Sequence, residues 1–209
     1  MDSADSEPQG RGAHRARHLA AAVDRSVKVL VVGPFGVGKT TLIEAVSEIP
    51  MLRTEETITT ASVGVDPRVG DKRTTTVAMD FGRLTVGGDT ALYLFGTPGQ
   101  RRFWDLWSGL ADGAVGALVL VDTRHLADSF EVLDQLEEHT QLPLTVVVNE
   151  FPDAPRHSVD EVRTALDLPA DTPVVAGDVR GRPQAVEALT TLVAHALRQR
   201  ERADEEAAA

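Results

Sequence analysis

The 209 residues, 42% of them hydrophobic, are enough for one compact domain with a full core. A formal net charge of -11 argues against a general nucleic-acid or anionic-membrane surface, because both need a positive footprint. The lack of cysteine excludes disulfides, thiolate metal sites and prenyl or palmitoyl anchors, and Asp2 stands where a myristoylated protein has glycine.

Three regions are expected along the chain. Residues 1–25 mix small, polar and charged residues without a sustained period, which predicts a flexible tail because such a segment cannot bury enough surface to offset its ordering entropy. Residues 26–200 are expected to form the folded domain. Residues 201–209 are typical of the frayed, solvated end of a helix.

Short apolar runs of strand length recur through the domain, and each is followed by a helical pattern. They occur at residues 27–32, 91–95, 114–121, 144–148 and 172–176. Continuous runs of this kind are typical of parallel strands buried on both faces, which predicts an α/β fold with a mostly parallel sheet between helices. Asp128 with Glu131, and Ser158 with Glu161, fit the pattern of a capping side chain followed three residues later by glutamate.

The end of the first predicted strand carries the strongest chemical signal. Residues 33–40 read GPFGVGKT and match the phosphate-binding pattern G-x-x-x-x-G-K-[ST] in its strand, loop and helix context. Backbone N–H groups of such a loop turn inward around phosphates, and the following helix adds its positive end. Lys39 supplies a charge for the terminal phosphates, and the Thr40 hydroxyl can bind magnesium.

Residues 74–86 break the alternation of strands and helices, because another strand begins within a few residues at Thr90. Two strands so close in sequence predict an antiparallel hairpin at one edge of the sheet. The second strand runs into Gly99 and Gln100, at the mouth of the crevice where ligands of open α/β sheets collect. A glutamine at this point can orient a water for attack on a terminal phosphate.

Together these motifs resemble the Ras superfamily of small GTPases, and most closely the actinobacterial conservon-type proteins, which are similar to the polarity switch MglA. The resemblance covers about residues 26–200 and rests on GPFGVGKTT, TTTVAMDFG and TPGQ. It implies a three-layer P-loop NTPase fold of the Ras-like type, in which a mostly parallel sheet of six strands, one of them an antiparallel edge strand, has helices on both faces. It also implies a switch that binds Mg-GTP and hydrolyses it slowly to GDP, with switch segments at about residues 51–76 and 97–108 that loss of the γ-phosphate releases.

The resemblance implies a role for individual residues around the phosphates. Thr40 and Thr76 would hold magnesium, and Gly99 would contact the γ-phosphate. Thr76 is chosen over Thr75 because the residues after it then fall in register with the family's edge strand. The residues expected to surround the nucleotide on this side are Gly33, Gly36, Val37, Gly38, Lys39, Thr40 and Thr41.

Three residues are expected to act in hydrolysis. Gln100 would position the water, and Lys39 would stabilise charge on the terminal phosphates. Arg73 precedes Thr76 by an offset similar to that of the built-in catalytic arginine of heterotrimeric G-protein α subunits, which can contribute roughly 10³-fold. A plain solvated loop is the alternative interpretation of the segment around Arg73.

The expected base-binding segment departs from the family pattern N-K-x-D. Asn149 fits this pattern, but Glu150 replaces the lysine, and Pro152 stands where the carboxylate belongs. That carboxylate accepts two N–H groups of guanine, a pairing that adenine cannot make. Asp153 comes one position late, and a one-residue bulge would bring it into place. The last base-side loop is expected at Asp178, Val179 and Arg180, with Arg180 stacked over the base; an ordinary turn is the alternative.

Gly96 is a further departure, because the family usually has an aspartate there that reaches magnesium through water. Asp80 and Asp122 are the carboxylates that could compensate for it. Gln100 and the intact phosphate loop favour a hydrolysing enzyme, whereas Gly96 and Pro152 favour a non-hydrolysing pseudo-GTPase scaffold. An ATP-preferring protein is a third alternative, because the phosphate loop does not read the base.

The expected ligands are GTP or GDP with Mg²⁺. The resemblance implies two protein partners, one of the roadblock family and one a sensor-kinase-like membrane protein. No apolar run approaches the roughly 20 residues of a membrane-spanning helix, and no lipid-attachment site is visible. We therefore expect a cytoplasmic protein without a direct membrane anchor or a nucleic-acid partner, which would reach the membrane through its protein partner.

Overall fold

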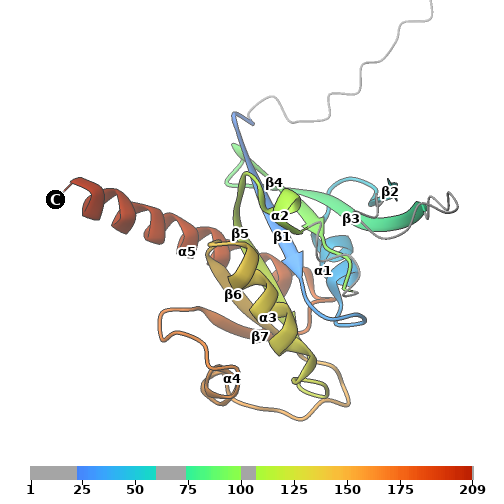
Figure 1. The fold of residues 1–209 in the computed structure, drawn as a ribbon, viewed down its shortest axis with the longest axis vertical. Helices are drawn as coiled ribbons and strands as arrows, with labels where there is room; N and C mark the ends of the chain where they lie inside the picture. Colours follow the sequence, from blue (N-terminus) through green and yellow to red (C-terminus); the bar gives the residue numbers. More distant parts are fainter. Residues whose placement is uncertain (1–22, 60–73, 100–106, 209) are drawn as a thin grey trace, which may run out of the picture.

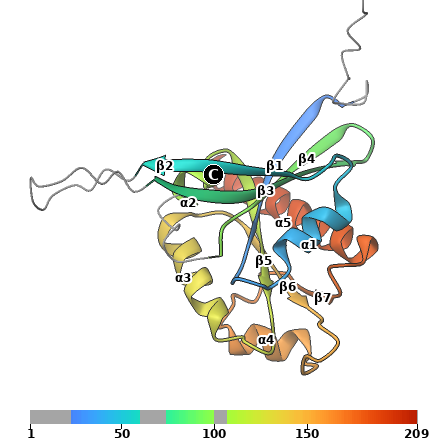
Figure 2. The same cartoon turned by 90° about the vertical axis from the view of Figure 1, so that its right-hand side faces the viewer.

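The computed structural model describes residues 23–59, 74–99 and 107–208, which form a layer of strands between two layers of helices (Figures 1 and 2). The strands are β1 (Arg25–Val32), β2 (Leu52–Thr59), β3 (Thr74–Val86), β4 (Thr90–Gly96), β5 (Ala114–Val121), β6 (Leu144–Asn149) and β7 (Val174–Gly177). The helices are α1 (Lys39–Val46), α2 (Trp107–Ala111), α3 (Asp128–His139), α4 (Val159–Ala165) and α5 (Arg182–Ala208). The predicted three-layer α/β fold is confirmed.

The sheet has the order β2-β3-β4-β1-β5-β6-β7. Strands β4, β1, β5, β6 and β7 are parallel, and β3 runs antiparallel to both β4 and β2. The predicted hairpin is therefore present, but the described part of the sheet has seven strands rather than six, and β3 is not at its edge. The reason is that residues 52–59 form a strand along the edge of β3 opposite β4, where they satisfy backbone groups of residues 74–81 that would otherwise lie at the edge of the sheet.

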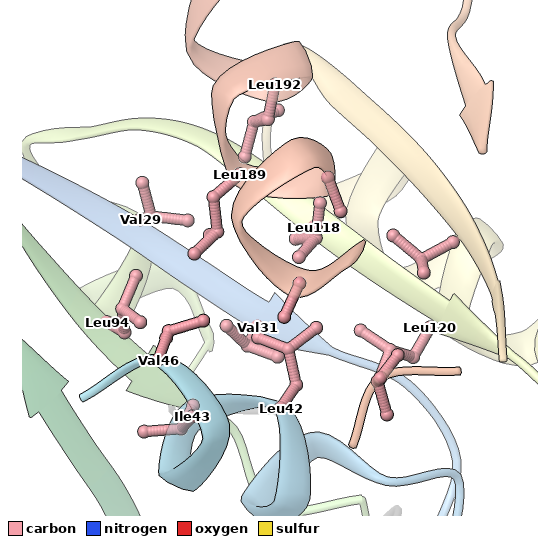
Figure 3. Close-up of a cluster of buried hydrophobic side chains, with 14 of the residues drawn as sticks. Val29, Val31, Leu42, Ile43, Val46, Leu94, Leu118, Leu120, Leu189 and Leu192 are labelled. Carbon is pink, nitrogen blue, oxygen red and sulfur yellow. The ribbon is translucent and has the colours of Figure 1, made fainter. Parts of the chain in front are cut away.

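Alternate residues of the strands are buried on opposite faces of the sheet. Val29 and Val31 of β1 pack with α1 and α5, whereas Leu30 and Val32 pack with α3 and α4. This explains why the strands read as continuous apolar runs, since both faces are covered by helices. Figure 3 shows the first of these clusters, with the labelled side chains Val29, Val31, Leu42, Ile43, Val46, Leu94, Leu118, Leu120, Leu189 and Leu192.

The two predicted helix caps have different outcomes. Ser158 and Glu161 form a capping box at the start of α4, which confirms the prediction. Asp128 is wrong as a cap, because α3 begins after Ala127 and no described side chain caps it. The backbone N–H groups of Asp128 and Ser129 instead donate to carbonyl oxygens three residues earlier, at 3.0 Å each, so the preceding turn does the work of a cap.

Helix α5 continues to Ala208, through exposed residues that the sequence predicted as the solvated end of a helix. Its buried residues end at Ala196, and the turns beyond project away from the sheet (Figure 1). Among the helices that the structure describes, none combines the length and the apolar character needed to cross a membrane.

Candidate functional site

The loop between β1 and α1 lies at the carboxyl end of β1, beside the carboxyl end of β4. Three of its residues, Gly33, Gly36 and Gly38, have φ angles of 147°, 79° and 107°. A side chain at Gly38 would also overlap its surroundings, because an added Cβ would lie 2.7 Å from the Asn149 side-chain nitrogen. No side chain of the described residues caps α1, so the N–H groups of its first turn stay available to an anion in this cradle.

Lys39 is held against the loop that it follows. Its ammonium group donates hydrogen bonds to the carbonyl oxygens of Gly33 and Pro34, both at 2.7 Å. Burial lowers the pKa of Lys39 to about 8, while the Asp80 carboxylate acts in the opposite direction. A phosphate group would offer this cation a charged acceptor in place of neutral carbonyls, and charge-assisted hydrogen bonds are the stronger kind.

Thr40 is joined to the strand beside β4. Its hydroxyl donates a hydrogen bond to the carboxylate of Asp80 on β3. A hydroxyl and a carboxylate are oxygen donors of the kind that Mg²⁺ prefers, and Mg²⁺ beside a triphosphate needs only one or two carboxylates because the phosphates and waters complete its shell. These two side chains therefore fit the ion, which would neutralise phosphate charge when bound.

Two further observations bear on the predicted metal ligands. Thr76 is in β3, where its backbone pairs with Thr57 of β2, and its side chain lies outside the described part of the molecule. Among the described residues, no three histidine, aspartate or glutamate side chains gather into a metal site of their own. Thr40 and Asp80 are described side chains whose oxygens meet at the start of α1.

Gly99, in the loop after β4, lies directly against the phosphate loop. A Cβ added to Gly99 would be 2.9 Å from the Lys39 ammonium nitrogen and 2.8 Å from the backbone nitrogen of Phe35. The same loop is anchored at its start, where the N–H of Thr97 donates to the Val31 carbonyl oxygen at 3.0 Å. Gln100 and Arg73, the other two residues predicted to act in hydrolysis, lie outside the described residues.

Asn149, at the end of β6, connects two loops. Its side-chain amide donates to the carbonyl oxygen of Val37 at 2.9 Å, and its side-chain oxygen accepts from the N–H of Val179 at 3.3 Å. The side chain is buried, with 4% of the residue exposed, so both bonds replace water. The structure thus brings together the phosphate loop and two of the predicted base-side segments.

A cavity of about 150 Å³ lies between these segments. It is lined by Gly36, Gly38, Thr41, Asn149, Glu150, Phe151, Pro152, Asp178, Val179 and Arg180. The guanidinium of Arg180 donates to the carboxylate of Asp178 at 2.6 to 3.0 Å, and this bonding lowers the pKa of Asp178. The predicted last base-side loop is therefore part of the cavity wall, with its own charges paired.

Asp153 lies outside this cavity lining. Arg124 donates to the two oxygens of its carboxylate at 3.0 and 3.2 Å. The same guanidinium binds both oxygens of Asp122, at 2.7 to 3.1 Å, and lies 3.8 Å from the centre of the Phe151 ring. Burial opposes ionisation of Asp122, but the hydrogen bonds from Arg124 outweigh it and hold the pKa of this carboxyl below its usual value.

The sequence carries no signal for the role of Arg124, because no local pattern marks an arginine that joins two acids 31 positions apart. It offers Asp80 only as one of two possible carboxylates. A signal for Asp80 was present in the predicted hairpin, since the short connection between β3 and β4 aligns Asp80 with Gly96.

Comparisons with known proteins agree with this geometry. A family model described as conserved hypothetical ATP binding protein matches residues 31–199. An uncharacterized protein of Methanocaldococcus jannaschii is 33% identical over 125 residues, which are 59% of this chain and 70% of that protein. The crystal structure of the G domain of the T. maritima FeoB iron transporter is similar with a TM-score of 0.56 and 19% identity, and the match covers 82% of this chain and 99% of that domain.

Proposed function

The chain belongs to the P-loop family described as conserved hypothetical ATP binding proteins and has the fold of a G domain, and from this premise we propose that it is a small switch that binds Mg-GTP and hydrolyses it slowly to GDP. The observation that carries the proposal is the close approach of Gly99 to Lys39. Lys39 is the residue that would bind the terminal phosphates. The loop after β4 would therefore lie beside a bound terminal phosphate, which would give the loop a further contact. Loss of that phosphate would remove the contact and release the loop.

Hydrolysis in this proposal depends on three residues. Lys39 stabilises the terminal phosphates, Gln100 orients the attacking water, and Arg73 acts as an arginine supplied by the chain itself. The intrinsic rate of such switches can be as low as about 10⁻⁴ per second, so phosphate release has to be followed over hours. Arg73→Ala is expected to slow single-turnover hydrolysis by roughly 10³-fold, and an unchanged rate would remove Arg73 from the mechanism.

The first experiment compares two lysines under the same conditions. Nucleotide is extracted from the purified protein, and GTP and ATP affinities are measured with and without Mg²⁺. Lys39→Ala should weaken triphosphate binding by about 100-fold, from the loss of charge-assisted hydrogen bonds worth about 2–3 kcal/mol. Lys28→Ala is the matched control, because Lys28 donates to the carbonyl oxygen of Asp112, away from the cradle. A protein that binds no triphosphate, or a Lys39→Ala variant that binds like the wild type, would contradict the proposal.

A preference for ATP is the second candidate function. It is favoured by the family description and by the position of Asp153, which Arg124 binds outside the cavity. Asp153→Asn tests it, because a carboxylate that reads guanine is needed for GTP and not for ATP. If Asp153 reads the base, this variant should lose GTP affinity selectively, with Asp160→Asn on α4 as the control. An unchanged ratio of GTP to ATP affinity would mean that Asp153 does not select the base.

The same measurements identify a non-hydrolysing scaffold. GTP that is bound but not cleaved, with or without a candidate partner, would favour this interpretation over a switch. We further propose, from the motifs TTTVAMDFG and TPGQ, that the chain is of the conservon type and acts with a roadblock-family protein and a sensor-kinase-like membrane protein. Binding of purified partners in the presence of GTP but not GDP would support that assignment.

A further inference from the structure

Asp80 and Gly96 are direct partners across two neighbouring strands. The antiparallel ladder of β3 and β4 pairs their Cα atoms. Residues directly opposite in such a ladder send their side chains to the same face of the sheet, with Cβ atoms only about 5 Å apart. A side chain at position 80 can therefore reach the region that a side chain at position 96 would reach.

The space beside Gly96 is already taken by Asp80. A Cβ added to Gly96 would lie 3.1 Å from the Asp80 Cβ and 3.5 Å from a carboxylate oxygen, with Ile43 of α1 at 3.0 Å. The Asp80 carboxylate lies beside Gly96 and accepts a hydrogen bond from the Thr40 hydroxyl at the start of α1. Glycine at position 96 is thus the residue that leaves room for this carboxylate.

Asp122 is the other acid that could serve the same purpose, and its contacts argue against it. Both oxygens of its carboxylate accept hydrogen bonds from Arg124, which also binds Asp153. The Asp122 charge is therefore committed to this ion pair. Asp80 is the acid that meets the Thr40 hydroxyl.

We propose that Asp80 supplies, from β3, the carboxylate on the magnesium side of the nucleotide site that β4 cannot supply at Gly96. The inference rests on the proposed function, since it requires a nucleotide bound with Mg²⁺. With Thr40 it gives the ion one hydroxyl and one carboxylate from the protein, and the remaining positions go to phosphates and water. The aspartate that the family usually has at position 96 on β4 is then replaced by Asp80 on the neighbouring strand β3. Nucleotide binding by this chain therefore still depends on magnesium.

The test measures release of a fluorescent GTP analogue from the full-length chain in Mg²⁺ and in EDTA. The wild type should release the analogue more slowly in Mg²⁺. Asp80→Asn, which keeps the shape and removes the charge, should reduce the ratio of the two rates by about 10- to 100-fold. Glu48→Gln is the matched control, because the Glu48 carboxylate also accepts a hydrogen bond from a threonine hydroxyl, that of Thr85, at 2.8 Å.

The outcomes separate this inference from the function on which it rests. A wild type that binds no analogue would overturn both. A wild type that responds to Mg²⁺, together with an Asp80→Asn variant of equal response, would overturn the role of Asp80 and leave the switch intact. Loss of the response in Asp80→Asn, but not in Glu48→Gln, supports the inference.

A double substitution tests whether a carboxylate at position 96 of β4 can replace the one at position 80 of β3. Asp80→Gly should lose the response to Mg²⁺, and the added change Gly96→Asp should restore it, because the carboxylate then starts from the opposite position in the same pair. Thermal melting establishes that both variants fold, and Asp80→Asn decides the question if either does not. A folded double variant that remains unresponsive would overturn the idea that β3 and β4 offer the carboxylate to the same point.

Discussion

Asn149 donates its side-chain amide to the carbonyl oxygen of Val37, 2.9 Å away, and so joins the end of β6 to the phosphate loop. Asn149→Ala would leave this oxygen and the N–H of Val179 without their partner in a buried place. We expect a loss of about 1–3 kcal/mol in the free energy of unfolding, measured by urea titration. Glu137→Ala, on the exposed side of α3, should change it little, and equal stability of the two variants would refute the expectation.

The close contact of Gly99 with the phosphate loop predicts that a side chain at this position will weaken the preference for GTP over GDP. In Gly99→Ala the added methyl group would overlap Lys39 and the backbone of Phe35, which forces the loop after β4 away from the phosphate loop. The preference for GTP over GDP should then fall by about tenfold, as measured by equilibrium binding. Gly109→Ala is the matched control, because its methyl group would meet no described atom within 4 Å. A preference that survives in Gly99→Ala would show that this loop does not sense the terminal phosphate.

The two helix starts predict a difference in stability. Ser158→Ala removes the acceptor for the N–H of Glu161, at 3.2 Å, and should cost about 1 kcal/mol in unfolding free energy. Asp128 makes no cap hydrogen bond. Asp128→Ala should therefore lower the unfolding free energy by only about 0.3 kcal/mol, the interaction of one exposed charge with a helix end. Denaturant unfolding of both variants checks the order, and a larger loss in Asp128→Ala would contradict it.

His195 predicts a dependence of stability on pH. Burial lowers its pKa, Arg198 and Arg202 lower it further, and Asp171 opposes them. Because the folded protein binds the proton less readily than the unfolded chain, stability should be lost as pH falls below about 6.5 toward the lowered value. His195→Gln should flatten the difference in unfolding free energy between about pH 7 and about pH 5. An identical pH profile in the variant would exclude His195 as a cause.

The local features of this protein follow from residues close together in sequence. The five apolar runs, the phosphate loop and the Ser158 capping box were all predicted, because a strand's burial, a loop's glycines and a cap's hydrogen bonds are each encoded within a few residues. The hairpin of β3 and β4 was predicted for the same reason. Asp128 does not cap α3, because backbone carbonyl oxygens of the preceding turn accept the hydrogen bonds of the first N–H groups of the helix. This turn is also a local feature, but its sequence carries no cap pattern.

The tertiary structure decided which distant groups meet. Thr40 and Asp80 are 40 positions apart, and Asn149 and Val37 are 112 apart, so their contacts exist only once the strands have taken their order in the sheet. The position of Asp153 was decided in the same way, by Arg124 from a different loop. By itself the sequence determined the cradle, whose conformation is a local property of glycines and one lysine. Which carboxylate serves that cradle depended on sheet register, which is a property of the whole fold.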